Sequence, residues 1–278
     1  MCSSDLVSSL IDQFEKRKPL EAADGGRALF LIGTGLMKKL LIADYLSANL
    51  VNRVFDFPNL YTGTETLAAV YAYAFQLYFD FSGYTDIALG SALLLGIKLP
   101  ANFNAPYSAE NIADFWRRWH ISLSNWLRDY VYFSLPGHRS KSRIYSYIHF
   151  PITMLICGIW HGLGWTYTLW GLYHGILLAG YYKIRPQAKR GANKLTMGGV
   201  GSILLMQQFS VIGWILFRLN HLSDLPAYLH NLTHGRFFSA IGDAEWMAVA
   251  LIAIVIVAHL IELAIPITAT AFRYRWNP

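Results

Sequence analysis

One histidine stands out because of the residues around it. His161 lies within residues 157–165, a run that otherwise consists of apolar residues and glycines. Apolar surroundings disfavour the charged form of an imidazole, so the ring stays neutral and can accept a proton. Ionisable groups are expensive inside apolar membrane segments and mark functional sites there. We interpret His161 as a candidate general base; the alternative is a packing histidine that donates to a backbone carbonyl.

Other polar side chains occur in similarly apolar sequence. His120 is a second candidate for chemistry. Asp80 and Asp86 flank Ser82-Gly83 and either shape a polar cavity or pair with arginines such as those at 117, 118 and 128. His174 follows His161 by 13 residues, and we expect it to pack or to form hydrogen bonds. Residues that could line a substrate site or cavity are Asp80, Asp86, Trp119, Ser124, Trp160 and His174.

Several common chemistries have no support in the sequence. It contains no HExxH, no paired CxxC, no Walker-type glycine loop and no Gly-x-Ser-x-Gly elbow. We therefore expect no metal site and no nucleotide hydrolysis. Its two cysteines, Cys2 and Cys157, do not form a disulfide framework. What remains is acid–base chemistry by one or two histidines.

The composition indicates the kind of protein that must position these groups. Of 278 residues, 54% are hydrophobic and 14% are charged, and the mean hydropathy is +0.32. Several apolar stretches approach the ~20 residues that cross a bilayer. We predict an all-α, polytopic transmembrane helical bundle with interfacial amphipathic helices. A polar connector occupies residues 1–27, and residues 28–278 form one membrane-embedded domain. The expected spans include 145–163, 165–183, 197–217 and 246–265, and further apolar segments cover 28–50 and 66–99, the latter too long for one ordinary span.

The basic residues suggest an orientation for these spans. The net charge of +6 is spread over short blocks between apolar segments, which indicates neither nucleic acid nor an acidic substrate. Basic loops at 138–143 and 183–194 flank the same helical hairpin, so both are predicted to be cytoplasmic. The joint at 162–164, and His161 beside it, then lie toward the outer half of the membrane or a cavity that opens there.

Three local features refine the predicted helices. Lys38 and Lys39 interrupt an apolar stretch, so that helix is expected to be tilted, broken or interfacial, with the lysines snorkelling. Ser82-Gly83 predicts a break in the long segment 66–99. Apolar residues recur every three to four positions over 112–131, after an N-cap at Asn111, which predicts one interfacial amphipathic helix with His120 on its inward face.

Four ordered motifs resemble the membrane-bound O-acyltransferase family. They are KKLLIAD at 38–44, YFDFSGYTD at 78–86, DFWRRWHISLSNWLRDY at 114–130 and GIWHG at 158–162. Within the family the resemblance is to the alginate O-acetyltransferase branch, with the teichoic-acid D-alanyl transferase branch as a relative. Members of the family usually carry further amino-terminal spans, so we expect an amino-terminally truncated member.

The resemblance implies a mechanism and a setting. The histidine that matches His161 is catalytic in the family, and the one that matches His120 is its second polar partner. His161 would take a proton from a sugar hydroxyl that attacks an acyl thioester, while His120 would orient the donor carbonyl or stabilise the oxyanion. No cofactor is expected to be tightly bound; the co-substrate is acetyl-CoA or another acyl thioester. The expected location is the bacterial inner membrane, and the expected partners are membrane lipid, an exported polysaccharide and periplasmic acetyltransferase-complex proteins.

Two other functions remain open at this point. A transporter or export-channel component would use the same intramembrane polar groups as a substrate path. Inverted repeats would favour transport, and the sequence has none. The second alternative is an inactive, scaffold-like fragment.

Overall fold

The computed structural model describes residues 20–137, 144–184 and 197–234, together with residues 10, 11, 13–15 and 253. Within them the regular secondary structure is entirely helical, which confirms the all-α prediction. The basic loop 138–143, residues 185–194 of the second basic stretch and nearly all of the predicted span 246–265 lie outside the described residues.

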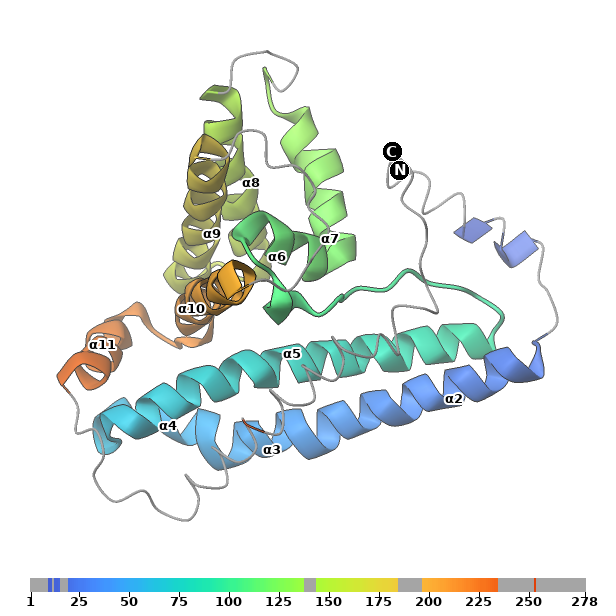
Figure 1. The fold of residues 1–278 in the computed structure, drawn as a ribbon, viewed down its shortest axis with the longest axis horizontal. Helices are drawn as coiled ribbons and strands as arrows, with labels where there is room; N and C mark the ends of the chain where they lie inside the picture. The colour runs from blue at the N-terminus through green and yellow to red at the C-terminus, as the bar shows by residue number, and fades with distance from the viewer. Residues whose placement is uncertain are drawn as a thin grey trace.

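Two long helical segments lie side by side (Figure 1). The first contains α2 (Ala22–Met37), the π-helical η1 (Lys38–Ala43), α3 (Asp44–Leu46), the π-helical η2 (Ser47–Val51) and α4 (Asn52–Asp56). After the short η3 (Pro58–Leu60), the chain returns as α5 (Gly63–Leu94), which begins at a capping box formed by Thr62 and Glu65. Because α5 is one continuous helix, the predicted break at Ser82-Gly83 is wrong.

The glycine that suggested a break serves instead as a contact between the two helices. A Cβ atom on Gly83 would lie 2.7 Å from the carbonyl oxygen of Gly35, and a Cβ on Gly35 would lie 2.6 Å from that of Gly83. Seven residues away on each helix, Gly90 packs against Ala28 in the same way, since a Cβ on Gly90 would lie 2.6 Å from the carbonyl oxygen of Ala28. Small residues let α2 and α5 approach backbone to backbone, as membrane helices do.

The lysine pair lies where α2 changes to π-helical geometry. Nζ of Lys38 is 2.7 Å from Asp86, and Nζ of Lys39 is 2.8 Å from Asp44 and 2.6 Å from Asp80. The expected snorkelling is therefore replaced by ion pairs between the helices. The aspartates do find cationic partners, but these are lysines. The arginines at 117 and 118 bind Asp114, and the one at 128 binds its neighbour at 129.

The segment predicted as one amphipathic helix is divided. After η4 (Pro106–Ser108), Asn111 caps α6 (Ile112–Arg118) by accepting from the N–H of Asp114 at 2.9 Å, so the predicted N-cap is confirmed. The helix then stops, and α7 (Ile121–Trp126) starts after His120 in a left-handed conformation. The π-helical η5 (Leu127–Val131) and η6 (Tyr132–Ser134) follow. A single helix over 112–131 was the wrong prediction.

The predicted hairpin around residues 162–164 is present. It consists of α8 (Ile144–His161) and α9 (Trp165–Ile184). Gly158 and Gly171 bring the two backbones together, because a Cβ at either would clash with a carbonyl oxygen of the opposite helix. Next come α10 (Met197–Arg218), η7 (Leu222–Asp224) and α11 (Leu225–His234). Among the described helices one, α10, is long and apolar enough over Gly199–Arg218 to cross a membrane.

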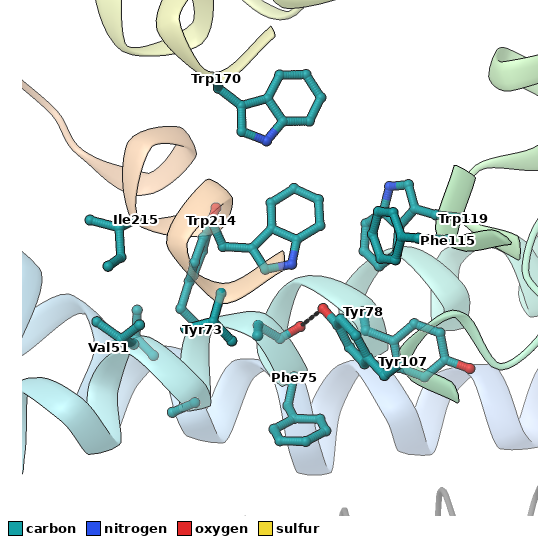
Figure 2. Close-up of a cluster of buried hydrophobic side chains, with 14 of the residues drawn as sticks. Val51, Tyr73, Phe75, Tyr78, Tyr107, Phe115, Trp119, Trp170, Trp214 and Ile215 are labelled. Atoms are coloured by element: carbon teal, nitrogen blue, oxygen red, sulfur yellow. Dashed lines mark hydrogen bonds between the residues drawn. The ribbon is translucent and has the colours of Figure 1, made fainter. Parts of the chain in front are cut away.

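An aromatic core joins the helix pair to the hairpin (Figure 2). We use this name for six residues of α6, its flank, α9 and α10, which are Phe115, Trp116, Trp119, Trp170, Trp214 and Phe217. Trp214 is 1% exposed, and its ring lies 4.9 Å from that of Trp119 and 6.0 Å from that of Trp170. Below it, the hydroxyl of Tyr107 donates to the carbonyl of Ala74 on α5 at 2.6 Å. The core thus sets the positions of α6, α9 and α10 relative to one another, and the bond from Tyr107 links this group to α5.

Candidate active site

His161 is the last residue of α8, directly before the glycine joint, and it is half-buried. Its imidazole meets three aromatic rings edge to face: Trp160 at 4.8 Å, Trp170 at 5.3 Å and Phe217 at 5.1 Å between centroids. Among the described residues, no hydrogen bond restrains its ring nitrogens. The alternative of donation to a backbone carbonyl is therefore not seen there. Rings from α8, α9 and α10 hold the imidazole and leave its nitrogens available.

Trp160 forms one wall beside His161. It is 65% exposed, although its ring also contacts the imidazole. The joint behind it is tight, since a Cβ on Gly162 would lie 2.6 Å from the ring of Tyr167. His161 itself is half-buried, so part of it reaches the surface of the described structure.

His120 occupies the break between α6 and α7. Its φ of 43° and ψ of 57° are left-handed, which is uncommon for a residue with a side chain. The loop before α6 stabilises the break through two backbone hydrogen bonds. The N–H of Asn104 donates to the carbonyl of Arg118 at 3.0 Å, and the N–H of Ile121 donates to the carbonyl of Asn102 at 2.9 Å. The imidazole packs against Phe81 of α5 at 4.6 Å. His120 thus faces the protein body, as predicted, but from a loop.

Asn102 is the residue that the sequence reasoning missed. Its Oδ1 lies 3.2 Å from Nδ1 of His120 and accepts from the N–H and hydroxyl of Ser122 at 3.1 and 3.0 Å. The Pro- and Asn-rich loop was recognised correctly, but nothing in the local pattern connects it to a residue 18 positions later. The available signal was the side-chain chemistry of asparagine, which commonly replaces backbone hydrogen bonds at breaks.

His161 affects the protonation of His120 electrostatically. Neither α6 nor α7, with 7 and 6 residues, is long enough to span a membrane, so His120 lies outside such segments. Burial lowers the pKa of His120 to about 4, and the charge of His161 contributes to the decrease. His120 is therefore neutral near pH 7. Although they are 41 positions apart in the sequence, the two histidines are thus within electrostatic range of each other.

His174 lies inside the aromatic core. It is fully buried, with Trp170 at 5.1 Å and Trp116 at 5.3 Å, and neither ring nitrogen has a hydrogen-bond partner within the described structure. The ring of Trp170 lies between it and His161. His174 is placed to pack, and the expected hydrogen bonding is not seen among the described residues.

The remaining candidates have structural contacts. Trp119 is buried and stacks on Phe115 at 5.7 Å and 14°. Ser124 donates to the carbonyl of Trp119 at 3.1 Å and so satisfies an acceptor at the helix break. Asp80 and Asp86 are engaged by the lysines of the first helical segment, and Phe81 between them contacts His120. No group of three or more His, Cys, Asp or Glu that could hold a metal occurs within the residues described.

Comparison with known proteins decides the family. The model of the MBOAT, membrane-bound O-acyltransferase family matches residues 15–195, a range that contains both histidines and the loop at 102–104. This chain belongs to the membrane-bound O-acyltransferases. The resemblance drawn from the four motifs is thereby confirmed, and with it the membrane nature of the protein.

Three curated proteins are similar to this membrane-bound O-acyltransferase chain. It is 44% identical to the probable alginate O-acetylase AlgI of Pseudomonas aeruginosa over 77% of the chain and 39% of that protein. It is 43% identical to the peptidoglycan O-acetyltransferase of Helicobacter pylori over 70% of the chain and 36% of that protein. It is 42% identical to the teichoic acid D-alanyltransferase of Bacillus subtilis over 41% of the chain and 31% of that protein. The chain therefore spans less than half of the length of these relatives.

Proposed function

We propose that the chain belongs to an O-acyltransferase in which His161 is the general base. His161 removes the proton from an acceptor hydroxyl as that oxygen attacks the carbonyl carbon of an acyl thioester. The new C–O bond forms, the C–S bond breaks, and the imidazolium returns its proton to the leaving thiolate. The observation that carries this proposal is a half-buried imidazole with unrestrained nitrogens between aromatic rings, with His120 in electrostatic range.

The acceptor that we propose is a hydroxyl of an exported polysaccharide, and the acyl group is acetyl. The names of the relatives include alginate, peptidoglycan and teichoic acid, which are polymers of the bacterial cell surface. Two of the three relatives named above transfer acetyl and the other transfers D-alanine. The donor in this proposal is acetyl-CoA or another acyl thioester from the cytoplasmic side, without a tightly bound cofactor.

We place the protein in the bacterial inner membrane as a multi-pass enzyme that works with periplasmic acetyltransferase-complex proteins. Exposed apolar side chains support contact with lipid. On α8 they recur every three or four residues and form one stripe, which consists of Ile148, Ile152, Ile156 and Ile159. α2 and η1 expose a further set, namely Leu29, Phe30, Leu36 and Met37 of α2 and Leu40 and Leu41 of η1.

Replacement of His161 by alanine tests the catalytic assignment. The variant H161A is introduced into the gene in its host, and the O-acetyl content of the cell-surface polysaccharide is measured at matched protein amounts. We expect transfer to fall by about 10²–10⁴-fold, which is the typical contribution of a general base. H174L is the matched control, because it removes a histidine of the aromatic core that has no place in the reaction. Unchanged acetylation by H161A would overturn the proposal, and polymer export without any acetylation would favour a transporter.

A further inference from the structure

We propose that Asn102 is a positioning residue that holds His120 in the tautomer with hydrogen on Nδ1, so that Nε2 faces the reaction as a hydrogen-bond acceptor. This inference rests on the proposed function for its role in acyl transfer, but the tautomer itself is independent of it. It begins with one atom, Oδ1 of Asn102, which meets three polar atoms within 3.2 Å.

The orientation of the Asn102 amide follows from its contact with the backbone. The N–H of Ser122 can only donate, so the side-chain atom 3.1 Å from it must be the oxygen. The Ser122 hydroxyl, at 3.0 Å, donates to the same oxygen. Oδ1 therefore faces His120 as an acceptor.

The tautomer of His120 follows from that orientation. Nδ1 lies 3.2 Å from Oδ1 and 3.4 Å from Oγ of Ser122. A bare Nδ1 would bring its lone pair against the lone pairs of Oδ1, which is repulsive. With hydrogen on Nδ1, the same contact is a hydrogen bond. In a neutral imidazole only one nitrogen carries hydrogen, so Nε2 carries a lone pair.

The surroundings keep the ring in this orientation. It meets the ring of Phe81 at 4.6 Å between centroids and at an interplanar angle of 80°. Its backbone is fixed on both sides by the loop that contains Asn102, through the bonds to Arg118 and Ile121. Burial keeps His120 neutral near pH 7, so Nε2 remains without a proton.

The inference changes the expected role of His120. Orienting a donor carbonyl or stabilising an oxyanion would require a hydrogen on Nε2, and the neutral Nδ1–H tautomer has none there. Nε2 instead accepts a hydrogen bond from a second hydroxyl of the acceptor sugar. That contact orients the sugar, while His161 takes the proton of the neighbouring hydroxyl that attacks. Asn102 acts through His120 and does not touch the substrate.

The test compares N102A, N102D and N104A in the whole chain. N104A is a matched control from the same loop, since the contacts of Asn104 with Arg118 use its backbone atoms. The tautomer is read from the ¹⁵N resonances of the His120 ring, assigned by their loss in H120Q. Transfer from radiolabelled acetyl-CoA to polysaccharide is measured against pH in membranes that contain the protein.

We expect hydrogen on Nδ1 in the wild type, N104A and N102D, and a mixture of tautomers in N102A. Transfer by N102A should fall roughly five- to tenfold, as for the loss of one hydrogen bond. The carboxylate of N102D keeps the acceptor but stabilises the imidazolium, so the acidic limb of its pH profile should move to higher pH. Hydrogen on Nε2 in the wild type, or an unchanged tautomer in N102A, would overturn the inference. Absence of transfer in the wild type with the expected resonances would overturn the proposed function alone.

Discussion

The imidazole of His161 meets the indole of Trp170 at 5.3 Å and 88°, an edge-to-face contact between the end of α8 and the middle of α9. Trp170 is 1% exposed, and its Nε1 has no hydrogen-bond partner among the described residues. The indole therefore acts through its shape. It forms one side of the imidazole's environment and separates His161 from His174.

Replacement of Trp170 by phenylalanine tests this contact. W170F retains an aromatic ring and loses no hydrogen bond, so we expect the protein to fold, with a loss of about 1–3 kcal/mol in the free energy of unfolding. Acyl transfer should fall by roughly tenfold, because His161 is held less firmly. Both quantities are measured on the same preparations, by tryptophan fluorescence during thermal unfolding and by radiolabel transfer. Full activity in W170F would mean that the ring does not position His161.

Replacement of His174 by leucine should preserve both the stability of the protein and acyl transfer, unlike W170F. Both ring nitrogens are buried without partners among the described residues, and burial of such polar groups costs about 1–3 kcal/mol. H174L removes that cost at similar volume, so we expect equal or greater stability and unchanged transfer. A loss of transfer at unchanged stability would instead give His174 a part in the chemistry.

The contact between Gly35 and Gly83 predicts a sharp difference between two glycines of α2. G35A places a Cβ 2.6 Å from the carbonyl oxygen of Gly83, so the helices must separate, at a cost of about 1–3 kcal/mol. G33A on the same helix has nothing within 4 Å of its new Cβ and should be neutral or stabilising by up to ~1 kcal/mol. Unfolding temperatures in detergent measure both. Equal effects of the two substitutions would exclude the close contact.

The ion pair between Lys38 and Asp86 predicts that the double variant K38M/D86N is more stable than the single variant K38M. K38M leaves the carboxylate without the cation at 2.7 Å and should cost about 3 kcal/mol, because both side chains are mostly buried. Addition of D86N removes the charge and should restore most of that loss. A double-mutant cycle measures the coupling. Strictly additive losses would show that the pair contributes nothing.

The sequence predicted the structural features that depend on residues close to one another in the chain. The hairpin around 162–164, the cap at Asn111 and the loop at 100–106 follow from glycine, asparagine and proline chemistry within a few positions. His161 and His120 were identified as the reactive pair because their motifs resemble a known family. The electrostatic effect of His161 on the pKa of His120 is consistent with that resemblance.

The errors concern features whose causes lie far away in the chain. Gly83 suggested a break because its partner, Gly35, is 48 residues earlier. The lysines were expected to snorkel since their aspartates at 80 and 86 lie on another helix. The break at His120 depends on Asn102, and periodicity continues through such a break because apolar positions recur on both sides of it. Local patterns do not contain this information.

The left-handed turn at His120 also divides the site between two structural units. His120 is attached to α5, through Phe81 and the loop that leaves that helix, whereas His161 is attached to the hairpin and to α10. The spacing between the two imidazoles is therefore set by how the long helix pair docks on the hairpin. In the proposed acyl transfer, a substrate that binds between these units would change the distance between the histidines, so we expect donor and acceptor binding to be coupled through that distance.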